Sequence, residues 1–161
     1  MKYTNTQLVW LVALRVFIGW HFLYEGVVKL ANPNWSSVGY LMDSQGFMSS
    51  FFYSLATNPT ALGVVDFLNV WGLIAVGLGL ILGAFTQLST ISGIILLTLY
   101  YLSHPPFVGL KYLLPMEGSY LLVNKNLIEL AALAVLWLFP TGKIIGLDRL
   151  IFSLKIKNRK F

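Results

Sequence analysis

Four long apolar segments constrain this chain more strongly than any other feature of its sequence. They cover about residues 8–30, 63–85, 88–104 and 123–139. Each approaches the length of about 20 residues that a helix needs to cross a bilayer. Only Thr86 and Gln87 separate the second segment from the third, which predicts a tight antiparallel hairpin. Because a backbone in lipid must satisfy its hydrogen bonds internally, we expect an all-α integral membrane four-helix bundle, a single domain over residues 1–161.

The balance of apolar and charged residues also favours a membrane protein. Of the 161 residues, 57% are hydrophobic and only 11% are charged, whereas a soluble domain carries about 25% charged residues. Residues 31–62 are rich in aromatic side chains and are interrupted by prolines, which predicts short interfacial helices between the first two spans. The first apolar segment is too long for a signal peptide, so we expect it to be a retained span.

Basic residues are concentrated near the end of the chain. The net charge is +5, and six of the eleven basic residues follow the last apolar segment: Lys143, Arg149, Lys155, Lys157, Arg159 and Lys160. Such a basic C-terminal tail is typical of the cytoplasmic side of a membrane and is attracted to anionic lipid head groups. With an even number of spans, both termini are expected in the cytoplasm. The expected partner of this charge is the lipid bilayer, not a nucleic acid.

The chain contains no cysteine, which excludes several kinds of redox chemistry. Disulfide exchange, thiolate catalysis, iron–sulfur ligation and thioether-linked haem all require cysteine. Any redox reaction would therefore use a bound cofactor, a quinone or a partner. His21 and His104 could in principle be axial ligands of a haem, but nothing in their spacing supports one, and we expect neither haem nor a metal site.

Ionisable residues recur at helical spacing inside the first span. His21, Glu25 and Lys29 lie four residues apart in turn, so they share one face of a helix with Arg15. We expect Glu25 to pair with Lys29 and to accept a hydrogen bond from His21. A charge within a bilayer costs several kcal/mol on most scales, so it persists only where it is paired or used. This face is therefore expected to point into the bundle and to carry function.

The other three spans place polar residues at the same depth. Asp66 and Asn69 open the second span, Tyr100 and His104 close the third, and Asn126 and Glu129 open the fourth. With the topology above, all of them lie in the outer half of the bilayer, whereas Arg15 lies alone in the inner half. The sequence thus predicts one site, with His21 and Glu25 as catalytic residues and with six residues that bind the ligand: Lys29, Asp66, Asn69, Tyr100, His104 and Glu129.

Several of these residues also have structural interpretations. Lys29 lies near the end of its span and could extend its ammonium to the head groups. Asp66 could cap the second span, and Asn124 and Asn126 could cap the fourth. Arg15 could bond backbone carbonyls or Gln87, or hold an anionic group of a ligand. His104 precedes two prolines and could simply end its helix.

Short sequence words in the first three spans resemble those of a known family. They are Gly19-Trp20-His21-Phe22-Leu23-Tyr24-Glu25-Gly26 with Lys29-Leu30, Asn32-Pro33, Trp35 and Gly39-Tyr40-Leu41, then Asp66-Phe67-Leu68-Asn69-Val70-Trp71-Gly72-Leu73 with Gly77, Leu80 and Gly83, then Tyr100-Tyr101-Leu102, and late in the chain Gly146-Leu147-Asp148. In this order and spacing, the words resemble DoxX-like proteins and are most similar to their DoxD branch.

The resemblance implies a four-helix membrane subunit of a thiosulfate:quinone oxidoreductase. Such an enzyme passes electrons from thiosulfate to the quinone pool and yields tetrathionate, with a DoxA partner. No DoxA-like region is present in this sequence, so we expect that partner to be a separate subunit. The expected location is the cytoplasmic (inner) membrane of a bacterium or archaeon.

These observations lead to a first hypothesis of a quinone-reactive membrane subunit. His21 would donate to one quinone carbonyl, and Glu25 would orient the imidazole and relay protons. Tyr100 or Asn69 would serve the other carbonyl. Lys29 and His104, at the mouth of the site, would attract an anionic donor.

Two other classes of function remain open from the sequence. The first is a non-catalytic scaffold, or a lipid-binding partner of a redox or stress-response complex, in which the polar cluster only fixes helix register. The second is a small-solute or proton carrier. A carrier would require a homo-oligomer, formed through the small-residue face at Gly79 and Gly83.

Overall fold

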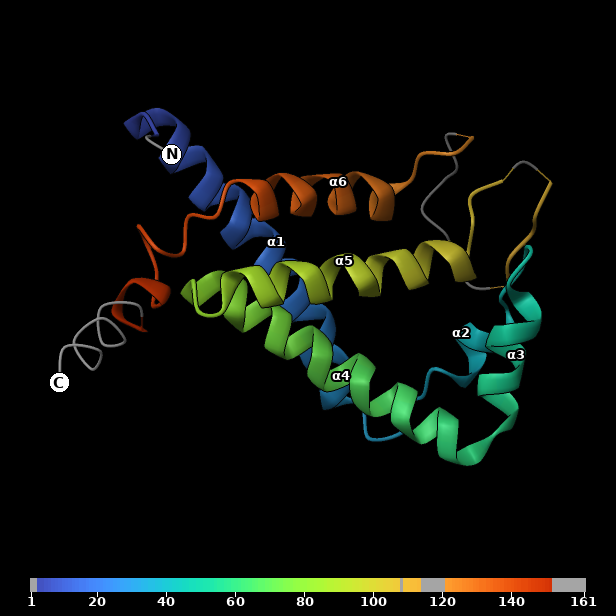
Figure 1. Cartoon of the computed structure of the whole chain (residues 1–161). Helices are drawn as coiled ribbons and strands as arrows, with labels where there is room; N and C mark the ends of the chain where they lie inside the picture. Colours follow the sequence, from blue (N-terminus) through green and yellow to red (C-terminus); the bar gives the residue numbers. More distant parts are fainter. Residues whose placement is uncertain (1–2, 108, 114–120, 152–161) are drawn as a thin grey trace, which may run out of the picture.

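The computed structural model describes residues 3–107, 109–113 and 121–151, and its regular elements are helices (Figure 1). They are α1 (Asn5–Ala31), α2 (Val38–Met42), α3 (Ser49–Thr57), α4 (Pro59–Leu82), α5 (Thr86–Ser103) and α6 (Lys125–Leu138). The all-α expectation is confirmed, and so are two short helices between the first two predicted spans. The basic tail from residue 152 onward lies outside the described residues.

The four longer helices pack in a ring around one apolar core. Helix α1 lies against α4, α4 against α5, α5 against α6, and α6 returns to α1. In Figure 1, α5 and α6 lie side by side, while α4 slants away below α5 from the hairpin that joins the two helices. The buried core residues come from all four helices: Ile18, Phe22, Leu73, Val76, Leu80, Leu97, Leu133 and Leu136.

Glycines allow α1 and α4 to approach closely. A Cβ atom built on Gly77 would lie 2.5 Å from the backbone nitrogen of Leu23 and 2.7 Å from the carbonyl oxygen of Gly19. Only glycine fits such a crossing, as is common where helices pack in membranes. A Cβ on Gly79 would likewise overlap the hydroxyl of Ser89 on α5. The predicted close approach at Gly79 therefore occurs within the chain, against α5.

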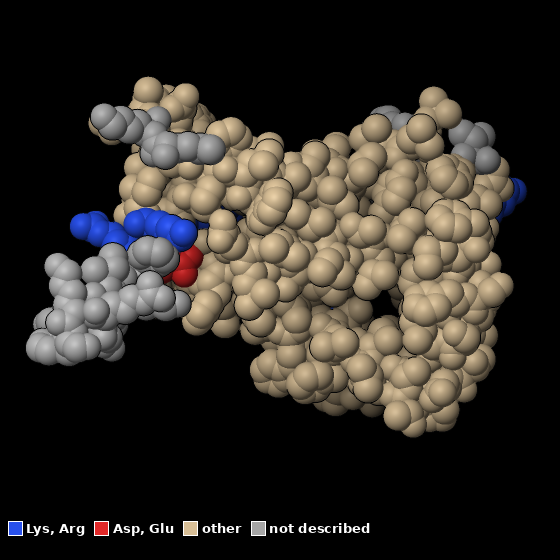
Figure 2. Space-filling model, viewed as in Figure 1, with Lys and Arg blue, Asp and Glu red and all other residues tan. Residues whose placement is uncertain are grey.

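Helices α1 and α4 have the length and the apolar composition to cross a membrane. Large apolar side chains on α1 remain exposed, among them Trp10, Phe17 and Trp20, each more than 60% exposed. Figure 2 shows a broad uncharged band on the visible face, with charged side chains only near its two ends. At 1.5 Å per residue, α6 would reach only about 21 Å, short of the roughly 30 Å hydrocarbon core. Two spanning helices are therefore supported, and the four-span topology stays a prediction.

A distant aspartate organises the α4–α5 hairpin. Gly83 ends α4 with φ +65°, and Phe85 before α5 also has a positive φ. The Asp148 carboxylate accepts hydrogen bonds from the backbone nitrogens of Phe85 and Thr86 and from the Thr86 hydroxyl, at 2.6, 3.0 and 2.5 Å. Because the first amides of a helix lack internal partners, this carboxylate acts as the cap of α5.

Arg15 fastens the C-terminal segment to the bundle at the same end. One guanidinium nitrogen donates to the Thr141 hydroxyl at 3.0 Å, and a second donates to the carbonyl of Ile145 at 2.9 Å. The residue is only 4% exposed. Of the alternatives that the sequence left open, bonding to a backbone carbonyl is confirmed, and Arg15 is structural here.

Candidate functional site

A cavity of about 540 Å³ opens at the end of the bundle opposite Arg15. It lies within the usual range of small-molecule sites, about 300–1,000 Å³. Its walls come from α1, the segment before α2, α2 itself, α4, α5 and the start of α6: His21, Phe22, Glu25, Lys29, Trp35, Ser36, Ser37, Gly39, Tyr40, Asn69, Leu73, Leu97, Tyr100, His104, Asn124, Lys125 and Asn126. The structure thus gathers most of the predicted site residues around one space.

The ionisable face of α1 forms one wall. The Lys29 ammonium lies 2.7 Å from a Glu25 carboxylate oxygen and 5.7 Å from the centre of the Trp35 ring. The predicted pair of Glu25 and Lys29 is confirmed. The Lys29 side chain is only 18% exposed, so it turns inward against the carboxylate and the indole instead of extending toward the head groups.

His21 binds a partner on another helix. Its Nδ1 lies 2.8 Å from Oε1 of Glu129 on α6, a separation of 108 residues in the sequence. The expected hydrogen bond from His21 to Glu25 is therefore wrong. Glu25 is already engaged by Lys29, whereas Glu129 projects from α6 toward the imidazole. The other oxygen of Glu129 is buried and has no hydrogen-bond partner among the described residues.

Tyr100 and Asn69 form a linked pair on the cavity wall. The Tyr100 hydroxyl donates to the Asn69 side-chain oxygen at 2.7 Å, and the Tyr40 hydroxyl donates to the Tyr100 carbonyl at 3.3 Å. The Asn69 oxygen is thus occupied, and the group that Asn69 can offer to a ligand is its amide NH₂. Tyr40 and Trp35 were not among the predicted site residues, although both lie within the sequence words that carry the family resemblance.

Asp66 supports the cavity from behind and does not cap α4. That helix begins seven residues earlier, at Pro59, with Asn58 as its N-cap. Asp66 instead accepts hydrogen bonds from the hydroxyls of Ser36 and Ser37 and from the Ser37 backbone nitrogen, at 2.8, 2.5 and 2.8 Å. It therefore holds in place the segment that carries Trp35, and the cap interpretation is wrong.

Two asparagines at the start of α6 have different positions. The Asn124 side chain accepts from the backbone nitrogen of Leu127 at 3.0 Å, so the predicted N-cap is confirmed. Asn126 lines the cavity, as does Lys125 between them. Lys125 was not predicted as a site residue, because a lysine at the start of a helix is usually interpreted as a solvent-exposed residue.

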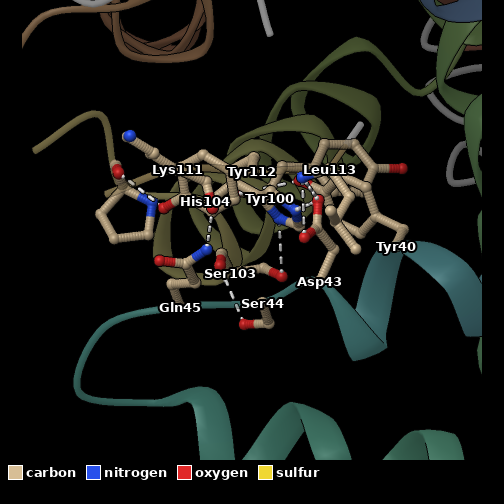
Figure 3. A network of polar contacts seen from close by, with 11 residues as sticks. Tyr40, Asp43, Ser44, Gln45, Tyr100, Ser103, His104, Lys111, Tyr112 and Leu113 are labelled. Carbon is tan, nitrogen blue, oxygen red and sulfur yellow. Dashed lines mark hydrogen bonds and ion pairs between the residues drawn. The ribbon is translucent and has the colours of Figure 1, made fainter. Parts of the chain in front are cut away.

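His104 lies in a buried polar network and not at an open mouth (Figure 3). The residue is 1% exposed, and its ring stacks on Tyr40 with 3.9 Å between ring centres. Tyr112 covers the ring at 4.7 Å, and Nε2 lies 3.7 Å from an Asp43 oxygen, which is beyond hydrogen-bond distance. The expectation that His104 attracts a donor at the mouth is wrong. Its position at the C-cap of α5 agrees with the structural interpretation.

The same network ties the segment after α5 to α2. Both carboxylate oxygens of Asp43 lie 3.0 Å from the backbone nitrogen of Leu113, which donates to them. The Tyr112 hydroxyl donates to the Pro105 carbonyl at 2.8 Å. Burial raises the pKa of Tyr40 and of Tyr112, with a smaller effect of the Asp43 charge on Tyr112. Both phenols therefore remain protonated donors near neutral pH.

Comparison with known proteins identifies the family of this chain. Searches among curated proteins and among solved structures found no match. Residues 10–104 match the DoxX family. The matched region is more than half of the chain, and it includes most of α1, all of α4 and most of the cavity wall. Together with the two apolar helices, this match establishes that the chain is a membrane protein and belongs to the DoxX family.

Proposed function

We propose that this chain is the quinone-binding membrane subunit of an oxidoreductase. One observation carries the proposal: a single cavity joins aromatic and apolar walls to the ionisable pair of His21 and Glu129. Quinone chemistry requires a slot for a flat ring, donors for its two oxygens and a group that exchanges protons. The residues that line the cavity include candidates for all three.

The residues present fit such a ligand. Tyr40, Trp35 and Phe22 line the cavity and give it an aromatic wall suited to a flat ring. The Asn69 amide is a donor on one side, and His21 is a proton-exchanging group on another. The volume of about 540 Å³ is sufficient for a substituted ring and the start of an apolar tail.

The resemblance to the DoxD branch supports thiosulfate as the electron donor. In that reaction two thiosulfate ions each give up one electron and join through a new S–S bond as tetrathionate, while one quinone takes up two electrons and two protons. In this chain, His21 would deliver a proton from its imidazole to a ligand oxygen, and Glu129 would stabilise the imidazolium. The cavity wall carries two lysines, Lys29 and Lys125, and one carboxylate, Glu25, so its net character is positive and favours an anionic donor.

The partner and the topology belong to the same proposal. The electron donor would be handled with a separate DoxA-like subunit, since a cysteine-free chain provides no thiolate for sulfur chemistry. The chain would cross the inner membrane four times with both termini in the cytoplasm. The cavity would then lie in the outer half of the bilayer, within reach of the quinone pool.

The test is to purify the protein in mild detergent and to identify what it retains by mass spectrometry. We expect stoichiometric quinone in the wild type and its loss in His21→Leu, because leucine removes the proton-exchanging group without adding a charge to the membrane. Saturable quenching of tryptophan fluorescence by added quinone measures the same site, and Trp35→Phe identifies the reporting indole. A wild-type protein that retains only lipid and shows no saturable quenching would contradict the proposal and favour the lipid-binding scaffold.

A further inference from the structure

Glu129 differs from the other carboxylates near the cavity in what it touches. Its side chain is 10% exposed, and one oxygen lies 2.8 Å from Nδ1 of His21, which is itself 31% exposed. His21 lines the cavity, whereas Glu129 stands behind it on α6. The carboxylate therefore acts on the imidazole and reaches a ligand only through it.

This contact decides which imidazole nitrogen faces the cavity. An ionised carboxylate accepts hydrogen bonds and donates none, so the nitrogen beside it must carry a proton. Nδ1 is then the donor to Glu129, and Nε2 is the nitrogen left for the cavity. Imidazoles that bind ligands or metals are commonly fixed in one tautomer by such a contact on the opposite nitrogen.

We infer that Glu129 is a positioning residue that holds His21 as the Nδ1–H tautomer and so presents Nε2 to an oxygen of the cavity ligand. The chemical role of Nε2 rests on the proposed function, whereas the tautomer does not. With a quinol, Nε2 accepts from the hydroxyl. With a quinone, the doubly protonated ring donates from Nε2, and Glu129 balances its charge. One of the two protons that a quinone takes up on reduction thus moves between Nε2 and the ligand oxygen, the two electrons come from the proposed donor, and Nδ1 keeps its own proton.

Glu25 cannot fill this position in the observed arrangement. It is on the same helix as His21, but its side chain is 46% exposed and its carboxylate is paired with Lys29 at 2.7 Å. Glu25 and Glu129 are therefore a matched pair: two glutamates near one histidine, of which only one touches it. Replacing each in turn separates positioning from a general loss of negative charge.

The experiment is nitrogen NMR of the imidazole rings in the ligand-free, full-length protein in detergent. The chain has only two histidines, so ¹⁵N-histidine labelling gives two rings, and His104→Gln assigns them. We expect His21 to show a protonated Nδ1 and an unprotonated Nε2 at a pH where the ring is neutral. Glu129→Leu should abolish this preference, because leucine has a similar volume and no acceptor. Glu129→Gln should largely retain it through its amide oxygen, and Glu25→Leu should leave it unchanged.

Quinone binding supplies the second arm of the test. Glu129→Leu should weaken quinone binding about tenfold, which corresponds to one lost charge-assisted contact. A wild-type His21 protonated on Nε2, or a Glu129→Leu ring that keeps the Nδ1–H form, would overturn the inference whether or not quinone binds. The expected tautomer in a protein that binds no quinone would support the positioning role and reject the proposed function.

Discussion

The two ends of the helix bundle both contain buried charge, but they use it differently. At the hairpin end, Arg15 and Asp148 direct their polar atoms at protein groups: a hydroxyl, a backbone carbonyl and the first amides of α5. At the other end, His21, Lys29 and Asn69 each bond a protein side chain and also line a cavity. A charge inside the bundle is therefore not in itself evidence for a ligand site.

The difference lies in what remains after the protein partners are satisfied. Asp148 uses both carboxylate oxygens on a helix cap, and the Arg15 contacts hold a chain segment, so these residues stabilise the fold. The Asn69 amide NH₂ and the second imidazole nitrogen of His21 remain available beside the cavity. Substitutions at the hairpin end should therefore change stability, and substitutions at the cavity end should mainly change ligand binding.

Asp148→Ala should have the largest effect. The carboxylate accepts three hydrogen bonds at the start of α5, and alanine would leave two backbone amides and a hydroxyl without their acceptor. We expect the free energy of unfolding to fall by about 3 kcal/mol, measured by circular dichroism during thermal unfolding in detergent. Asp148→Asn keeps one acceptor and should lose about half as much. We also expect the folded fraction of Asp148→Ala to bind quinone with unchanged affinity. A loss of quinone binding without a loss of stability would contradict this and place the ligand site at the hairpin end.

Two adjacent tyrosines test the cavity end with a built-in control. Tyr100 bonds Asn69 on the cavity wall, whereas the Tyr101 hydroxyl donates to the Leu122 carbonyl away from the cavity. Tyr100→Phe should weaken quinone binding about fivefold to tenfold, because the Asn69 amide loses the bond that orients it. Tyr101→Phe removes an equal hydroxyl and should stay within about twofold of the wild type. Equal losses in fluorescence titrations of the two variants would show that the cavity wall is not the binding surface.

Helical periodicity is enough to predict the polar face of α1 and the end of the bundle where the cavity lies. His21, Glu25 and Lys29 recur every four residues, so their common face follows from helix geometry alone. The pair of Glu25 and Lys29 is a local contact within one helix, and it is confirmed. Contacts of this kind depend only on the spacing of residues along one helix, so they can be predicted from the sequence alone.

Contacts between helices could not be predicted in the same way. The partner of His21 depends on how α6 is rotated against α1, and the spacing of residues along either helix does not determine that rotation. The cap interpretation of Asp66 placed the start of the helix near the start of the apolar segment, because hydrophobicity does not mark where α4 begins. The helix begins at Pro59 in a polar stretch, and Asp66 meets two serines of a connecting segment. In each case a polar side chain had several acceptable partners, and packing selected one.

Asp43→Ala should loosen the segment that closes the network around His104. Its carboxylate is the acceptor for the Leu113 backbone nitrogen, and the loop residue Lys111 is exposed. We expect local opening to become easier by about 1–2 kcal/mol, so that trypsin cleaves after Lys111 about tenfold faster. Cleavage after Lys125, which begins α6, is the internal control and should not accelerate. An unchanged rate at Lys111 would show that Asp43 does not hold this segment.

The smallest effect concerns alkaline pH and the Tyr112 phenol. Burial, with a smaller effect of the Asp43 charge, raises the pKa of Tyr112 in the folded protein, whereas an unfolded tyrosine ionises near pH 10. The stability that Tyr112 contributes is therefore fully present below about pH 10 and is lost as the pH rises through its folded pKa.

Tyr112→Phe removes this ionisation together with the hydrogen bond to Pro105. In thermal unfolding we expect the variant to be less stable than the wild type by about 1 kcal/mol at pH 8, and this gap should narrow as the pH rises to 11, because only the wild type loses stability by ionisation. A gap that widens with pH would mean that the ionised phenol is stabilised in the fold, which contradicts its place beside Asp43.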